Sequence, residues 1–190
     1  MRTLIQQATA LAMLVAIGGC EGSHPHQTAD SGSPGNPFVT TYCRTAEPKA
    51  PEPSYLTIGA VSLPAMADLG DAYQPTPDEH GVTFYKGGVE IRPDYPAVTV
   101  TIGAAARSYA RIENESYQGP LADGALSITY AGRPRTTAEN DWTCWYVGGY
   151  NLLDRRTTAC LPLDVTIAGD PAVHHVTVPI GRKCAETTES

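Results

Sequence analysis

From Tyr55 onward the chain consists of short runs rich in Val, Ile, Thr and Tyr, separated by Gly, Pro, Asn and Asp. Residues 98–102, 163–167 and 176–180 alternate between apolar and polar side chains. Because successive side chains of a β-strand point to opposite faces, each of these runs can bury one face and expose the other. This pattern is typical of antiparallel sheets that have one side in water, and it predicts an all-β fold.

Eight runs are expected to form strands: Tyr55–Leu63, Val82–Tyr85, Val89–Arg92, Ala97–Ile102, Ala125–Tyr130, Trp142–Val147, Ala159–Ile167 and Val173–Ile180. Short strands at this spacing predict an antiparallel β-sandwich. It is immunoglobulin-like only in a loose sense, since the Cys–Trp–Cys spacing of true immunoglobulin domains is absent. Residues 85–89, which contain two glycines, predict a tight hairpin, and residues 168–172 predict a longer one.

Two segments leave alternatives open. Ala104–Glu115 alternates well as a strand, and as a helix it would place Arg107 and Arg111 four residues apart, a mildly unfavourable like-charge pair. We therefore favour a strand there, with a helix as the alternative. Ala65–Ala72 could form one or two helical turns.

The segment 20–53 differs in composition from the rest of the chain. Gly, Ser, Pro, Thr and Asp dominate it, and it offers few apolar residues to offset the entropy lost on ordering. We expect a disordered tether over residues 20–53 and a β-sandwich domain over residues 54–190.

The N-terminus carries the features of an export signal. Arg2 is followed by an apolar run from about Ala8 to Ile17, and two glycines precede Cys20. The run is about a dozen residues long, whereas a membrane-spanning helix needs about 20. Residues 14–20 resemble the lipobox of a bacterial lipoprotein signal peptide.

That resemblance implies removal of residues 1–19, lipidation of Cys20 with acyl chains such as palmitate, and a domain held outside the cytoplasm in the cell envelope. An ordinary signal peptide with a cysteine nearby is the alternative. More than one acyl chain gives durable attachment to a membrane, because each buried CH₂ contributes about 0.8 kcal/mol.

The cysteine count agrees with export. With Cys20 assigned to the lipid, four of five cysteines remain, an even number that predicts two disulfides. Of the three possible pairings we favour Cys144–Cys160 and Cys43–Cys184. The first would close a short loop and stabilise the fold by about 3 kcal/mol, and the second would join the two ends of the domain.

Charge limits the classes of partner. The chain has 20 acidic and 13 basic side chains, and loss of Arg2 with the signal would leave a net charge of −8. An acidic exported protein is a poor candidate for binding nucleic acid. We expect contact with the membrane through the lipid and, beyond it, with an envelope protein or glycan.

Catalytic motifs are missing from the sequence. It contains no Gly-x-Ser-x-Gly, Ser-x-x-Lys, His-Glu-x-x-His, phosphate-binding glycine loop or EF-hand pattern. His174 and His175 lie in one predicted strand and point to opposite faces, so they cannot share a metal. We predict no catalytic residues, no metal and no cofactor.

Aromatic side chains around Cys144 give the best lead to a binding surface. On a strand, Trp142, Cys144 and Tyr146 share one face and Trp145 takes the other. If the cysteine faces the core, Trp145 and Tyr150 are partly exposed, close to two arginines. Amphipathic rings beside polar groups suit a sugar or protein surface. The candidate ligand-binding residues are Trp145, Tyr150, Arg155 and Arg156, and plain packing is the alternative.

We therefore predict a cell-envelope lipoprotein that presents a β-sandwich binding or structural module. Two alternatives from other classes remain. One is an envelope hydrolase or carbohydrate-active enzyme with a site built from loops, and the other is an accessory lipoprotein that binds a solute or a metal.

Overall fold

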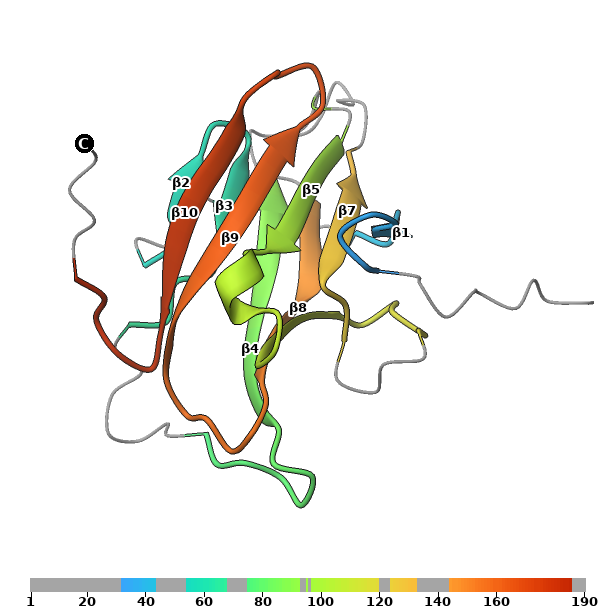
Figure 1. Ribbon diagram of the computed structural model, residues 1–190. Helices are drawn as coiled ribbons and strands as arrows, with labels where there is room; N and C mark the ends of the chain where they lie inside the picture. The colour runs from blue at the N-terminus through green and yellow to red at the C-terminus, as the bar shows by residue number, and fades with distance from the viewer. Residues whose placement is uncertain are drawn as a thin grey trace, which may run out of the picture.

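Two five-stranded sheets pack face to face in a β-sandwich (Figure 1). The computed structural model describes residues 32–43, 54–67, 75–92, 95, 97–119, 124–132 and 144–185. The all-β class and the sandwich predicted from alternation are confirmed. The one helical element in these ranges is a 3-10 turn, η1, at Ala104–Ala106.

The first sheet, called here the β9 sheet, has the strand order β1-β7-β5-β9-β10. Every neighbouring pair is antiparallel except β1 and β7, which are parallel. Its strands are β1 (Phe38–Thr40), β5 (Ala97–Ile102), β7 (Ser127–Ala131), β9 (Ala159–Ile167) and β10 (Val173–Ile180). The predicted bounds of β5, β9 and β10 are confirmed, as is the 168–172 hairpin that joins the last two strands.

The second sheet, called here the β8 sheet, is antiparallel throughout and has the order β2-β3-β4-β8-β6. Its strands are β2 (Leu56–Ile58), β3 (Val61–Leu63), β4 (Thr83–Ile91), β6 (Ala110–Asn114) and β8 (Cys144–Leu152). The predicted strand 55–63 is thus a hairpin of two short strands. In Figure 1 the β8 sheet lies behind the β9 sheet.

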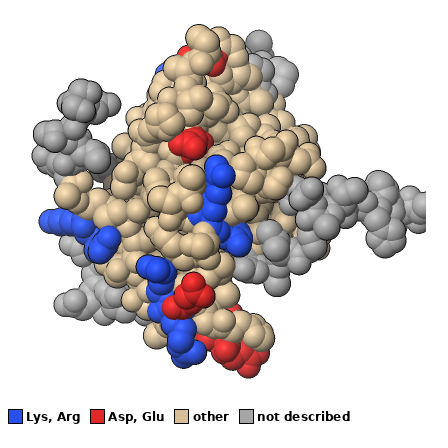
Figure 2. Space-filling view, in the orientation of Figure 1, with Lys and Arg blue, Asp and Glu red and all other residues tan. Residues whose placement is uncertain are grey.

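The core lies between the sheets and follows the predicted alternation. Val98, Val100 and Ile102 of β5 are buried, and so are Leu163, Val165 and Ile167 of β9. The threonines between them face outwards. There the Oγ1 atom of Thr99 lies 2.7 Å from that of Thr129 on the neighbouring strand β7. Figure 2 shows the outer side of the β9 sheet, which is covered mainly by uncharged residues.

The tight hairpin predicted at residues 85–89 is wrong. These residues continue through one nine-residue strand, β4, which pairs with β8 along its whole length. Gly87 lies opposite Gly148, and a Cβ atom on Gly88 would stand 1.5 Å from Nε1 of Trp145. The glycines make room for close packing across the strand pair instead of turning the chain.

The ambiguous segments resolve into different structures. Residues 104–115 contain the short η1 followed by β6, so the strand we favoured covers only Ala110–Asn114. Residues 65–67 form no helix, since Met66 makes a parallel bridge to Ile180. The remainder of the predicted helical turn, 68–72, lies outside the described residues.

The sandwich includes residues that precede the predicted domain boundary at residue 54. β1 lies within the segment 20–53, and its Cα register with β7 runs from Phe38–Ile128 to Thr40–Tyr130. Phe38 is buried and packs edge-on against Tyr117, with ring centroids 5.1 Å apart. Residues 38–40 therefore belong to the sandwich.

All four predicted cysteines form disulfides, but the predicted pairing is wrong. The bonds are Cys43–Cys144 and Cys160–Cys184. Cys144 faces the core, whereas Cys160 alternates with buried Ala159 and Leu161 and so points outwards from β9. The two cysteines lie on opposite sides of the β9 sheet, which prevents the predicted Cys144–Cys160 bond. The two disulfides fit an oxidising compartment outside the cytoplasm.

Candidate binding surface on the β8 sheet

Tyr150 is not part of an exposed rim. β8 extends through Gly148 and Gly149 to Leu152, which gives Tyr150 the same orientation as Cys144 and Tyr146. Its side chain is only 2 % exposed. The expectation of partial exposure is therefore wrong, because it took the two glycines as the end of the strand.

Arg155 and Arg156 lie far from Trp145. Both are exposed and follow β8 in a turn where Asp154 and Arg155 have φ values of 55° and 58°. The guanidinium carbon of Arg156 stands 4.3 Å above the ring of Tyr109. The seven steps along the strand from Trp145 to Leu152 span roughly 23 Å, since a strand rises about 3.3 Å per residue. The four predicted ligand-binding residues do not form one site.

Trp145 does lie on the outer face, as predicted, and is partly exposed. It pairs with Glu90 on β4, and the Nε1 edge of its indole covers Gly88 of that strand. Trp142, the other tryptophan, lies outside the described residues. The structure thus retains Trp145 from the predicted set and places it above the backbone of β4.

Phe84 is a second aromatic residue on this face, and our sequence reasoning missed it. Its side chain is 37 % exposed, and its ring lies near Gly149, where an added Cβ would be 2.9 Å from Cε2. Each ring therefore crosses to the neighbouring strand and rests near a glycine. From the register, those two glycines lie roughly 8 Å apart. The alternation of Thr83, Phe84 and Tyr85 could have indicated it, because a strand that buries Thr83 and Tyr85 turns Phe84 outwards.

Polar side chains surround the two rings. Lys86 is exposed between them on β4, and Glu90 lies beside Trp145. Asn151, opposite Phe84, donates from Nδ2 to the Glu113 carboxylate at 3.0 Å. We call this surface the aromatic face and define it by six residues: Phe84, Lys86, Glu90, Glu113, Trp145 and Asn151. Asn151 is buried and holds the Glu113 carboxylate in place. Aromatic carbon beside a fixed carboxylate can stack on a ligand and accept hydrogen bonds from its hydroxyls.

The histidines of β10 pair with carboxylates. His174 Nε2 lies 2.9 Å from Asp170 Oδ2, and His175 Nδ1 lies 2.8 Å from Asp164 Oδ1. The Ala172 backbone N–H and then the His174 ring hold the pKa of Asp170 below its usual value. Within the described ranges, no three His, Cys, Asp or Glu side chains gather closely enough to hold a metal ion.

Comparisons with known proteins give no relative. No family model, no curated protein and no solved structure matches this chain. In the part of the chain that the structure describes, no helix is both long and apolar enough to cross a membrane.

Proposed function

We propose that the protein is a lipid-anchored module of the bacterial cell envelope that binds an envelope glycan on its aromatic face. The anchor rests on the lipobox-like sequence that ends at Cys20 and on two disulfides that fit an exported protein. The binding role rests on one observation: Trp145 and Phe84 present their rings on one sheet face beside carboxylate and ammonium groups.

This arrangement suits a sugar for physical reasons. The apolar faces of a sugar ring gain from contact with aromatic carbon, and its hydroxyls need donors and acceptors placed around that contact. The Glu113 carboxylate is held by the hydrogen bond from buried Asn151, so little side-chain entropy is lost when a ligand binds to it.

Lipidation of Cys20 is tested by fractionation. In a bacterial host with lipoprotein-processing enzymes, the wild-type chain should partition with membranes, and mass spectrometry should find an acylated N-terminal Cys20. The Cys20→Ser variant should lose both the membrane partitioning and the acylation, because serine offers no thiol for the lipid. Ser23→Ala is the matched control and should stay with membranes. An unmodified, uncleaved N-terminus in the wild type contradicts the anchor.

Binding at the aromatic face is tested by tryptophan fluorescence. Trp142→Phe leaves Trp145 as the only tryptophan, so its emission reports on this face. Titration with soluble peptidoglycan fragments should change that emission and saturate. Trp145→Ala and Phe84→Ala, measured by isothermal calorimetry because the first variant lacks the reporter, should each weaken binding by about tenfold, the effect of losing a good ring contact.

The control for this titration is Val39→Ala. Val39 is 58 % exposed on β1 of the other sheet, so its loss removes apolar surface without touching the aromatic face. Binding by isothermal calorimetry should be unchanged in that variant. Equal affinity in the wild type, Trp145→Ala and Phe84→Ala would refute the proposed surface and leave the anchor untouched.

A further inference from the structure

β10 is an edge strand with an open side. It is the last strand of the β9 sheet and pairs with β9 from Val173 to Ile180. Among the described residues, its other side meets the chain only at its C-terminal end. There the Met66 N–H donates to the Pro179 carbonyl and the Gly181 N–H donates to the Met66 carbonyl, both at 2.7 Å.

The Met66 contact reveals which backbone groups face outwards. In an antiparallel pair, the N–H and C=O of one residue point to the same side, and this side alternates along the strand. Because the Pro179 carbonyl points away from β9, the backbone groups of Thr177, His175 and Val173 point away as well. The N–H and C=O groups of these three residues have no backbone partner in the described part of the chain.

The open edge of β10 already has the backbone geometry that pairing with another strand requires. Met66 already forms a parallel bridge with Ile180, so the geometry of an added strand is present at one end of β10. Pro179 has no N–H and marks where that bridge begins, as expected for proline on a sheet edge. The length left open, from Val173 to Thr177, matches a short extended peptide of about five residues.

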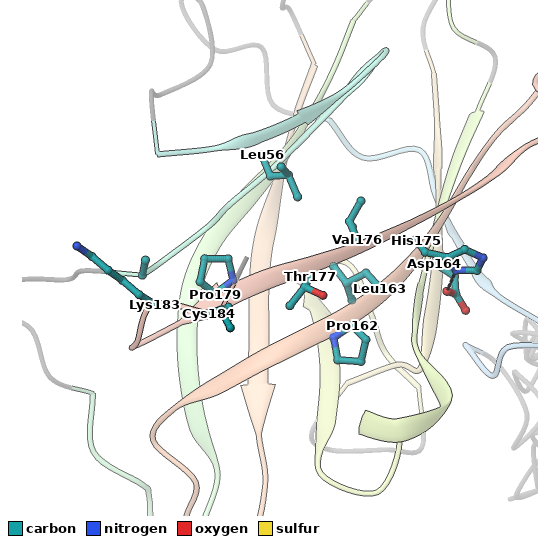
Figure 3. A pocket seen from close by; sticks show the side chains of 12 residues that line it. Leu56, Pro162, Leu163, Asp164, His175, Val176, Thr177, Pro179, Lys183 and Cys184 are labelled. Carbon is teal, nitrogen blue, oxygen red and sulfur yellow. Dashed lines mark hydrogen bonds and ion pairs between the residues drawn. The ribbon is translucent and has the colours of Figure 1, made fainter. Parts of the chain in front are cut away.

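An apolar hollow of about 900 Å³ lies beside this open edge. Figure 3 shows that its lining runs along β10 and across to Pro162 and Asp164 of β9, and that Leu56 of β2 reaches it from the facing sheet. Thr177 and Pro179 line it from β10. A strand added to β10 would place alternate side chains against this hollow.

Charge at one end of the hollow selects the occupant. Lys183 lines it and is exposed, next to exposed Arg182, and neither has an ion-pair partner among the described residues. At the other end Asp164 is already bonded to His175. The unbalanced charge is therefore positive, which favours an acidic residue in the bound segment. β10 itself contains no acidic residue, and Asp170, which precedes it, is already bonded to His174, so a second copy of this strand would not supply a free carboxylate.

We propose that the open edge of β10 binds an extended, acidic-flanked segment of another protein by strand addition. The segment pairs with the outward groups of Val173, His175 and Thr177. It buries alternate apolar side chains against Leu56 and Val176 and places a carboxylate near Lys183. This site is separate from the aromatic face, which lies on the outer side of the other sheet.

A defined peptide tests the proposal on the full chain in detergent. The probe has three valines alternating with two threonines and a glutamate at each end. We expect it to shift the amide resonances of Val173, His175 and Thr177 in a saturable NMR titration. Thr177→Pro removes one outward N–H without touching the pairs with β9, and it should weaken binding by about three- to tenfold. Thr177→Val keeps that N–H and should bind within about twofold of wild type.

Two further peptides separate backbone pairing from apolar adhesion. One is N-methylated on its valines and the other on its threonines, so only one of them loses the donors that face β10. Exactly one of the two should lose binding. Equal binding by both, shifts that map away from β10, or Thr177→Pro and Thr177→Val variants of equal affinity overturn the proposal. Concentration-dependent dimerisation that Thr177→Pro abolishes would also overturn it, because the occupant would then be a second copy.

Discussion

At the scale of single residues, the four buried tyrosines Tyr85, Tyr130, Tyr146 and Tyr150 differ in how their hydroxyls are satisfied. The Tyr85 hydroxyl donates to the Thr157 carbonyl and that of Tyr146 to the Ala131 carbonyl. The buried Tyr150 hydroxyl has no hydrogen-bond partner among the described residues. Burial first, and then the neighbouring Tyr130 and Tyr55, raise the pKa of Tyr150 well above its usual value.

Tyr150→Phe should therefore leave the free energy of unfolding unchanged or raise it by up to about 1 kcal/mol, because an unsatisfied buried hydroxyl is removed. Tyr85→Phe is the matched variant and should lower it by about 1 kcal/mol, because it removes the hydrogen bond from the Tyr85 hydroxyl to the Thr157 carbonyl. Urea unfolding of the two variants measures the difference. A loss in Tyr150→Phe as large as that in Tyr85→Phe would contradict this account.

At the scale of elements, the close approach of β4, β8 and β6 depends on glycine. A Cβ on Gly148 would stand 2.0 Å from the backbone carbonyl oxygen of Glu113 on β6. Backbone atoms cannot move aside as a flexible side chain can, so the sheet itself would have to open at this point.

Gly148→Ala should lower the free energy of unfolding by about 1–3 kcal/mol, the usual effect of overpacking. Gly35→Ala is the control, since a Cβ at Gly35 meets nothing within 4 Å. Thermal denaturation compares the two variants. Equal melting temperatures would show that β6 and β8 have room for an added methyl group at this point.

The strands were predictable where one face is apolar and the other is not. Val98–Ile102 and Leu163–Ile167 met this condition, and their buried sides followed from parity alone. The double glycines could not be read in the same way, because glycine suits both a turn and a close backbone contact. Tyr150 was misplaced for that reason, since its side depends on β8 continuing through Gly149.

The candidate surface was predictable only in part. Trp145 on the outer face followed from alternation with Cys144, whereas the partnership with Phe84 depends on the register of β4 against β8. That register joins residues about 60 positions apart, and no local pattern encodes it. Strand alternation alone argued against a Cys144–Cys160 bond. Leu161 and Leu163 face the core, so Cys160, one residue before Leu161, faces the outer side.

At the scale of the whole molecule, the two disulfides constrain the chain differently. Cys43–Cys144 spans 101 positions and joins the segment after β1 to the start of β8, across the two sheets. Cys160–Cys184 spans 24 positions and fastens the chain after β10 back to β9. Longer loops lose more entropy in the unfolded chain when they are closed.

Replacing Cys43 and Cys144 together by serine should therefore destabilise the protein more than replacing Cys160 and Cys184. In the chain-entropy model the losses are about 4.7 and about 3.5 kcal/mol. Guanidinium unfolding of the two double variants measures them, and non-reducing peptide mapping of the wild type verifies the pairing. A larger loss of unfolding free energy in the Cys160/Cys184 variant would mean that native packing, and not loop closure, decides which disulfide stabilises more.

The Cys43–Cys144 bond also determines how the sandwich would respond to mechanical load. Tension applied from the N-terminal side would load the bond from the Ser127 N–H to the Gly32 carbonyl and then β1, and a three-residue parallel strand can peel away easily. The peeling would stop at Cys43, where the pull passes through a covalent link into β8, a nine-residue strand paired on both sides. Under reducing conditions the Cys43–Cys144 link is broken. Single-molecule stretching should therefore give a short extension in the oxidised protein and complete unfolding in the reduced one.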